Sequence, residues 1–208
     1  MLKNILYILL FIFITSCKTD INTNPPTKSC IISGKNFDDS TKYLDIINED
    51  LSIFPDCICN LQNLETLYLF NCHLADLPDC ISNLKKLEFL ALNSNTFDHL
   101  PESICKLNNL KKLDVSGNLL TTLPKSIDNL TNLQVLTASY NFISLLPESI
   151  GNVKSLIMID LKGNLLSKLP ETIINLNGLV FLYLQENNFS DIEKERIKKL
   201  LPNCTIYW

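Results

Sequence analysis

The sequence predicts an α/β protein in which one short unit is repeated into a right-handed solenoid, a horseshoe with a parallel β-sheet on its concave side and short helices on its convex side. Three observations predict this fold. The chain repeats itself every 23 residues without insertion or deletion, and such periods are typical of repeat architectures. Two positions are apolar in every copy, and an Asn and a Pro recur at fixed positions in most copies. The seven repeats begin at Asp38, Leu61, Leu84, Leu107, Leu130, Val153 and Leu176.

The N-terminal region predicts export and a lipid anchor. Residues 1–16 contain an apolar run of about ten residues, which is too short to span a membrane and is typical of a signal peptide. The following Ile14-Thr15-Ser16-Cys17 resembles a bacterial lipobox, which implies cleavage before Cys17 and acylation of that residue, palmitate included. The alternative is an ordinary secretory signal with an incidental cysteine. Lys18 replaces the Asp that resembles an inner-membrane retention signal, so we expect the outer membrane of a bacterial cell envelope.

Residues 17–37 are predicted to be a tether between the anchor and the solenoid. They are rich in Thr, Asn, Lys and Pro and contain few large apolar residues, a composition typical of linkers. The segment from Cys30 to Ile32 is a candidate capping strand. The solenoid itself is assigned to residues 38–189, and polar Asp38 and Thr41 suit a terminal repeat.

Each repeat contains a predicted strand. In residues 110–116 the apolar Leu113 and Val115 alternate with polar residues, which is the period of a short strand with one buried face. Asn118 follows, and its amide can pair with backbone groups that have no partner in the sheet. Stacked Asn side chains are therefore expected to form a buried polar ladder, with Cys72 as a weaker rung and Glu49 at the solvent-exposed end.

The second half of each repeat is predicted to turn on the convex side. Pro124 sets a backbone angle suited to a first helical turn, and residues 124–130 leave room for one or two turns. Acidic residues follow several of the equivalent prolines, as Glu102 does, and negative charge favours a helix N-terminus. One repeat cannot bury its apolar side chains alone, so about three or more must stack.

The combined pattern LxxLxxLxLxxNxLxxLPxxI resembles the leucine-rich repeat family, in the 23-residue variety also seen in Ras-group and plant intracellular members. The resemblance extends from about Asp38 to the C-terminus. It implies the repeat fold, but it says little about the partner, because function depends on sites carried by a fold.

Residues 190–208 are predicted to form a C-terminal cap. Ser190-Asp191-Ile192-Glu193 has the pattern of a capping box, and the helix that it begins should end before Pro202. Cys204, Ile206 and Trp208 then alternate with polar positions, which predicts a last strand that closes the core. We expect no second domain.

Composition argues against several functions. Without residues 1–16 the chain has 17 basic and 22 acidic residues, a formal charge of −5, whereas nucleic-acid binding requires a basic stripe. Seven cysteines besides Cys17 leave at least one unpaired. The candidate disulfides join Cys30 to Cys57 or Cys59, or Cys57 to Cys80, and Cys72 and Cys204 are expected to be free thiols. The remaining cysteine is Cys105.

No pattern predicts an enzyme, a metal site or a cofactor. The two histidines, His73 and His99, fall in different columns of the repeat, and a zinc site needs ligand pairs at suitable spacing. Asp114 and Asp160 share a concave column two strands apart, about 10 Å, with Thr137 between them. On an open sheet nothing excludes water from this pair, so we interpret both as solvated strand residues.

The concave face carries the strongest functional prediction. All tyrosines after residue 16 lie on or beside it, including Tyr207, and aromatic residues are enriched at binding hot spots. The alternative is that they simply pack on cross-strand neighbours. We expect a protein or peptide ligand, with a glycan or a purely structural envelope role as alternatives. The predicted ligand-binding residues are Tyr43, Tyr68, Phe70, Phe89, Asp114, Tyr140, Asp160, Lys162, Phe181 and Tyr183.

Overall fold

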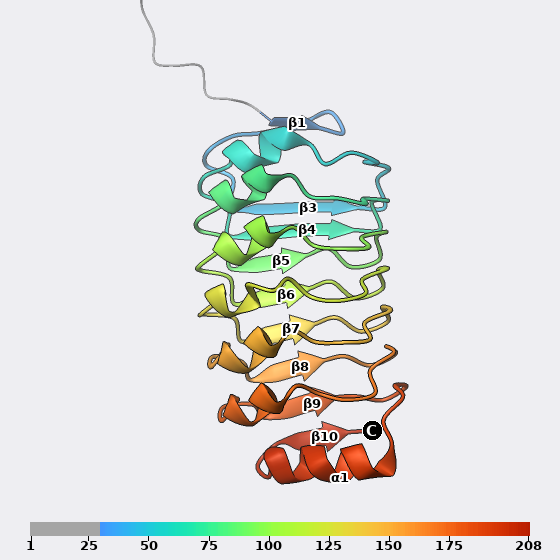
Figure 1. The fold of residues 1–208 in the computed structure, drawn as a ribbon. Coiled ribbons are helices and arrows are strands. Elements are labelled where there is room, and N and C mark those ends of the chain that lie inside the picture. The colour runs from blue at the N-terminus through green and yellow to red at the C-terminus, as the bar shows by residue number, and fades with distance from the viewer. Residues whose placement is uncertain (1–29) are drawn as a thin grey trace, which may run out of the picture.

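The computed structural model describes residues 30–208, and the predicted signal peptide, Cys17 and most of the predicted tether lie outside this range. The described chain is one continuous stack of rungs, with a sheet along one side and short helices along the other (Figure 1). Eight parallel strands are ordered in the sheet as they are in the chain. They are β3 (Tyr43–Ile47), β4 (Thr66–Phe70), β5 (Phe89–Ala91), β6 (Lys112–Asp114), β7 (Val135–Thr137), β8 (Met158–Asp160), β9 (Phe181–Tyr183) and β10 (Thr205–Tyr207).

The strand register confirms the repeat period. From β3 to β9 each residue pairs with the residue 23 positions later, as Leu67 does with Leu90. The two apolar columns point into the stack, where Leu113 and Val115 are fully buried. The core therefore runs the length of the solenoid between the sheet and the convex segments, and each repeat shares it with its neighbours.

The predicted asparagine ladder is present. The Asn118 side-chain Nδ2 donates to the carbonyl oxygens of Leu92 and Val115, both at 3.0 Å, and its Oδ1 accepts the amide of Phe97 at 3.1 Å. The Cys72 thiol donates to the carbonyl oxygens of Ile46 and Phe70 at 3.4 Å. Each buried Asn thus satisfies backbone groups of two adjacent repeats, which ties the rungs together where the strands end.

The convex segments are 3₁₀-helices, and the prolines do not begin them. Pro147 lies just before its helix with φ −66° and ψ 145°, an extended conformation, so the expectation of a proline inside the first turn was wrong. A proline loses nothing there, because its missing N–H has no helical acceptor in that position. The six helices are η1 (Asp56–Asn60), η2 (Asp79–Asn83), η3 (Glu102–Lys106), η4 (Ile127–Asn129), η5 (Glu148–Asn152) and η6 (Glu171–Asn175).

Both ends of the described stack are capped. At the N-terminal end, β1 (Cys30–Ile32) pairs antiparallel with β2 (Lys35–Phe37) in a separate two-stranded sheet. At the other end, α1 (Asp191–Leu200) begins with Ser190, whose Oγ accepts the Glu193 amide at 3.2 Å. The Glu193 carboxylate pairs with Arg196 at 2.6 Å and accepts the Leu169 amide at 3.0 Å. It therefore links the cap to the last convex segment instead of completing a capping box.

Two disulfides hold the N-terminal repeats. Cys30 is bonded to Cys57 across a Cα–Cα distance of 5.1 Å, and Cys59 to Cys80 across 5.7 Å. The first was one of the sequence alternatives. The second was not, and the proposed Cys57–Cys80 pair is wrong, because Cys57 is already bonded and the diagonal step between rungs brings Cys59 to Cys80. Three described thiols are free: Cys72 and Cys105, which are buried, and Cys204, which is half-buried.

Candidate ligand-binding surface

The N-terminal half of the concave face carries an aromatic group made of Tyr43, Tyr68, Phe70 and Phe89. The strand register places Tyr43 and Phe89 in one row and Tyr68 in the next. The rings of Tyr68 and Phe70 are 6.2 Å apart with an interplanar angle of 21°, and Tyr43 is 66% exposed. Ala91, beside Tyr68 in the register, is fully buried although it faces the same way, because longer side chains flank it. The predicted aromatic residues therefore occupy neighbouring positions on three adjacent strands, with Thr66 between Tyr43 and Phe89.

A second aromatic group lies at the C-terminal end of the sheet. Tyr207 pairs in register with Tyr183, which confirms its expected place in the concave column. Their rings stack with centroids 4.5 Å apart and an interplanar angle of 4°. Phe181 is on the same strand as Tyr183 and is 37% exposed. Stacking fixes these side chains before any ligand arrives, so little conformational entropy remains to be lost on binding.

Between the two groups the ends of strands β6 to β8 are polar, whereas Val135 and Met158 at the starts of β7 and β8 are apolar and half-buried. The Asp114 carboxylate accepts the amide of Ser116 at 3.0 Å and its hydroxyl at 2.6 Å. The Asp160 carboxylate accepts the amide of Lys162 at 3.0 Å. Thr137 lies between the two aspartates in the register. Both carboxylates thus bond to backbone groups just beyond the ends of their own strands.

Tyr140 lies at the rim of this surface in an unusual backbone conformation. Its φ of +54° is uncommon for a bulky side chain, and its ring is half exposed. The Lys162 Nζ is 5.4 Å from the ring centroid and 3.1 Å from the Glu186 carboxylate. Two hydrogen bonds raise the pKa of Lys162 above its usual value. The bond to Tyr140 has the larger effect and the bond to Glu186 the smaller one. The Tyr140 ring therefore contacts the next rung through the Lys162 ammonium group, and its direction is set by the positive φ of its backbone.

Sequence reasoning missed a charged column at the strand starts. Lys42 and Glu65 form an ion pair at 2.8 Å, and Lys111 and Glu88 one at 2.7 Å. This pairing raises the pKa of Lys42 and lowers that of Glu65. The signal was available, since the two members of each pair are 23 residues apart and opposite in sign. Beside them lies a cavity of about 270 Å³ whose walls are Tyr43, Glu65, Thr66, Glu88, Phe89, Lys111 and Lys112.

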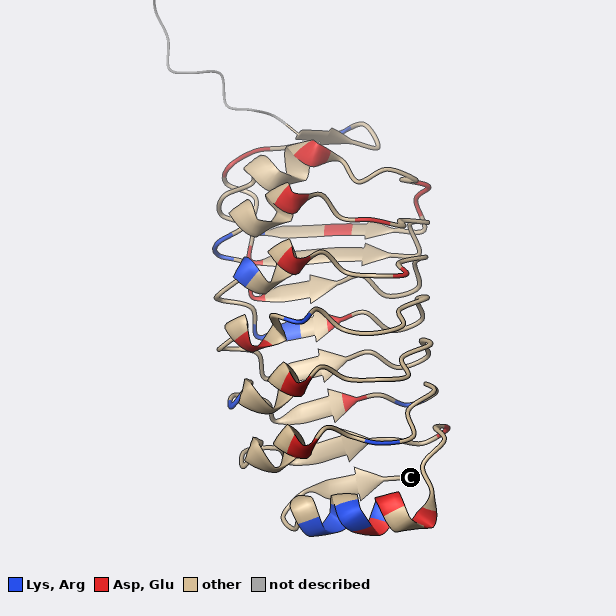
Figure 2. Ribbon diagram, viewed as in Figure 1, with Lys and Arg blue, Asp and Glu red and all other residues tan. Residues whose placement is uncertain are grey.

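Charge is unevenly distributed over the molecule. Acidic residues mark the starts of most convex helices and both signs gather on α1, whereas most of the strand ribbon carries no charge (Figure 2). Within residues 30–208 no three metal-ligating side chains come together, and no helix in that range is long and apolar enough to cross a membrane.

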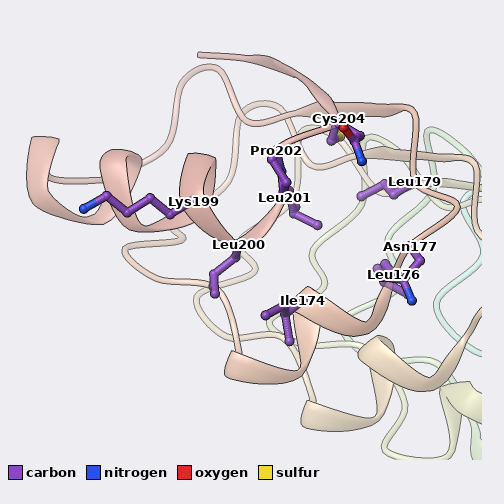
Figure 3. Close-up of a pocket in the computed structure, with 10 residues that line it drawn as sticks. Ile174, Leu176, Asn177, Leu179, Lys199, Leu200, Leu201, Pro202 and Cys204 are labelled. Atoms are coloured by element: carbon purple, nitrogen blue, oxygen red, sulfur yellow. The ribbon is translucent and has the colours of Figure 1, made fainter.

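A separate cavity of about 340 Å³ lies beside the C-terminal cap. Figure 3 shows that Ile174 comes from the last convex helix and that Leu200 and Lys199 come from α1. None of the predicted ligand-binding residues lines this cavity. It is formed where the cap packs on the final repeat, away from the concave aromatic surface.

Comparisons with known proteins identify the family to which the chain belongs. The model described as "Leucine rich repeat" matches residues 85–143, and a model described as "Leucine Rich repeats (2 copies)" matches residues 62–102. The chain is a leucine-rich repeat protein. No curated protein matches its sequence.

Several solved structures resemble this leucine-rich repeat protein. A leucine-rich repeat protein of Leptospira interrogans is 41% identical over 76% of the chain, with a TM-score of 0.74. An internalin from Listeria monocytogenes is 23% identical over 76% of the chain, with a TM-score of 0.64, and shows the fold alone. The ectodomain of the plant membrane receptor kinase GASSHO1/SCHENGEN3 from Arabidopsis thaliana, solved in complex with Casparian strip integrity factor 2, is 37% identical over 64% of the chain, with a TM-score of 0.58. The chain spans 40%, 44% and 17% of these three proteins, respectively.

Proposed function

We propose that this protein is a non-enzymatic binding module that recognises a protein or peptide on its concave face. Leucine-rich repeat proteins generally mediate protein–protein interactions and are typically not enzymes. The plant receptor ectodomain, solved in complex with Casparian strip integrity factor 2, supports the same class of function for a related fold.

The observation that carries the proposal is that aromatic side chains of the concave face are held in fixed positions by their neighbours. Tyr68 stacks on Phe70, Tyr183 stacks on Tyr207, and Tyr140 is held by Lys162. Aromatic residues contribute most to binding when they are rigid and can be desolvated by a partner. The polar strand ends at Asp114, Thr137 and Asp160 separate the two stacked groups, so the surface suits a ligand with two apolar contact regions.

The test is a double substitution of Tyr68 and Phe70 by Ala. Both side chains are only half-buried and lie on the concave side, outside the buried core, so the circular dichroism spectrum should remain unchanged. We expect capture of partners from surface or host extracts to fall at least about tenfold, as is usual for the loss of hot-spot aromatics. The matched control is Ile174→Ala, which removes an exposed apolar side chain from the convex side. Unchanged capture by a folded double variant would show that the site is assigned wrongly.

The same experiment separates the ligand classes. If a glycan array binds the protein and the double substitution abolishes that binding, the ligand is a sugar and the proposal of a protein ligand is wrong. If neither extracts nor glycans yield a partner that responds to the substitution, a structural role in the envelope replaces it.

We further propose that an acylated Cys17 holds the protein at a bacterial outer membrane. Support comes from the sequence pattern before Cys17 and from Lys18 after it. Each buried CH₂ of an acyl chain contributes about 0.8 kcal/mol to membrane binding, so several chains would make the anchor permanent. Cys17→Ala should abolish incorporation of labelled palmitate and release the protein from the outer-membrane fraction. If the variant still incorporates palmitate and stays in that fraction, the anchor is assigned wrongly.

A further inference from the structure

The aromatic group at the C-terminal end of the sheet has one ring face that no aromatic neighbour covers. Strands β8, β9 and β10 are consecutive in the sheet (Figure 1), and the register places Tyr183 directly between Asp160 and Tyr207. Tyr207 covers one face of the Tyr183 ring, with centroids 4.5 Å apart and an interplanar angle of 4°. This distance is close to the strand spacing of about 4.8 Å, so the rings stack along the solenoid axis. The other face of the Tyr183 ring therefore points toward β8, over Asp160.

Asp160 carries a charge that the protein does not compensate. Its carboxylate accepts the Lys162 amide at 3.0 Å through Oδ1, and within residues 30–208 it forms no ion pair. The Lys162 ammonium group is already committed, because its Nζ lies 3.1 Å from the Glu186 carboxylate and 5.4 Å from the centroid of the Tyr140 ring. On the β7 side, the register partner of Asp160 is the uncharged Thr137.

The wider surroundings leave this excess of negative charge in place. The next charged residues along the concave strands are Lys112 and Asp114 of β6, which have opposite signs and lie two strands away, about 10 Å. A neutral acceptor also lacks a donor, since Gln185 Oε1, two residues beyond Tyr183, is buried and has no hydrogen-bond partner within residues 30–208. The surface beside the free ring face thus has more acceptors than donors.

We propose that the space between the free face of the Tyr183 ring and the Asp160 carboxylate, the Tyr183–Asp160 site, binds an arginine side chain of the partner. The planar guanidinium group continues the stack of Tyr207 and Tyr183, within the roughly 6 Å over which a cation is attracted to a ring. It also donates to the Asp160 carboxylate below it in a charge-assisted pair. The inference rests on the proposed function, because it names the side chain that a protein or peptide ligand places there.

Arginine fits this site better than a lysine or an aromatic side chain does. A lysine ammonium group is compact and strongly hydrated and cannot stack as a plane. An aromatic ring would stack on Tyr183 but would take water away from the Asp160 carboxylate without pairing it, which is unfavourable. Only a guanidinium group meets both the ring and the charge, and the half-buried Met158, two residues before Asp160, offers apolar surface to the arginine stem.

The ligand class is tested by NMR titration of the full chain in detergent micelles with capped pentapeptides that carry one side chain between glycines. We expect the arginine peptide to shift the ring signals of Tyr183 and Tyr207 to saturation. Dissociation constants should be at least about tenfold higher for lysine, which cannot stack, and for neutral citrulline and phenylalanine, which cannot pair with the carboxylate. Absence of a saturable shift, or equal affinity for any of the other three peptides, overturns the proposal.

Two variants separate the charge from the ring. Asp160→Asn keeps the Oδ1 acceptor of its backbone hydrogen bond and removes the charge, whereas Tyr183→Leu removes the ring and keeps the charge. Each should raise the dissociation constant of the arginine peptide at least about tenfold. The matched control is Asp114→Asn, whose carboxylate has the same kind of backbone bond but has Ala91 and Thr137 as register neighbours. It should change the affinity by less than about twofold, because its charge is largely screened at this distance. An equal loss in the control would show unspecific attraction and overturn the site.

The proposed function and this inference fail in different ways. Capture of a partner that depends on Tyr68 and Phe70, without any binding of the arginine peptide, would support the concave face as a protein-binding surface and overturn the arginine site. Binding of the arginine peptide that requires Asp160 and Tyr183, without any partner that depends on Tyr68 and Phe70, would support the arginine site and contradict the proposed function as stated.

Discussion

The ring of Tyr140 lies over the backbone of Gly163 in the next repeat. A Cβ atom added to Gly163 would come within 2.6 Å of the Tyr140 Cδ1 atom. Both residues have positive φ, +54° for Tyr140 and +65° for Gly163. Every repeat has a positive φ at this position, and the other five residues there are Asn48, Asn71, Ser94, Gly117 and Glu186. The bulky Tyr140 side chain therefore fits at this position because the next repeat has a glycine, Gly163, at the same position.

Replacing Tyr140 by Asn should separate stability from binding. Asn occupies the same position in the first two repeats and tolerates the left-handed conformation better than an aromatic residue. We expect the free energy of unfolding to stay the same or rise by up to about 1 kcal/mol, and capture of the concave-face ligand to weaken. Urea denaturation and the capture assay check the two effects. A loss of stability without loss of capture would mean that Tyr140 is only structural.

Replacing Gly163 by Ala should destabilise the protein by about 1–2 kcal/mol, because a Cβ is unfavourable at this positive φ and also displaces the Tyr140 ring. In the Tyr140→Ala background the ring is absent, so the same change should cost less. A double-mutant cycle measured by denaturation reports the difference. Additive effects would contradict the contact.

Removal of one rung of the asparagine ladder should cost more than about 3 kcal/mol, because Asn118→Ala leaves the Phe97 amide and the Leu92 and Val115 carbonyls without their side-chain partner. Asn118→Cys should cost less, since a thiol serves two carbonyls at Cys72. Thermal or urea unfolding compares the two variants. Equal losses would show that the thiol does not substitute for the amide.

A disulfide equivalent to Cys59–Cys80 should form two repeats further along when a second cysteine is introduced there. Cys59 and Cys80 are bonded, and two repeats later the equivalent positions are Cys105 and Ser126. We expect Ser126→Cys to form a disulfide with the otherwise free Cys105 under oxidising conditions. Peptide mapping without reduction detects it, and Ser149→Cys, one repeat further along, is the matched control. A free Cys105 in the variant would show that the fourth repeat departs from the geometry of the second.

Stability should fall at high pH through Cys105. Burial raises the pKa of this thiol to about 12, above its ordinary value of 9.0. Between these two pH values the unfolded chain loses the proton while the folded chain keeps it, so the stability that the thiol contributes is complete below about pH 9 and declines as pH rises toward 12. Cys105→Ala should reduce the slope of unfolding free energy against pH in this window. An unchanged slope would exclude the thiol as its source.

The candidate site was predictable in composition but only partly in arrangement. The strand period placed Tyr68, Phe70 and Tyr183 on the concave face, and the structure has them there. The contacts that hold Tyr140 depend on Gly163 and Glu186 in the next two rungs. The sequence predicted contacts between rungs for the asparagines, the cysteines and Asp114 with Asp160, but the charged column that starts with Lys42 and Glu65 was not predicted.

The sequence by itself determined the repeat length, the strands, the apolar core and the asparagine ladder, because each is a local pattern copied at one interval, and stacking identical units leaves a single register. Only the tertiary structure decided that Cys59 bonds to Cys80 and that β1 pairs with β2. The β1–β2 pair lies before the first repeat, and the disulfide depends on how far the chain moves sideways from one rung to the next. That displacement is set by packing across the stack, and no single repeat encodes it.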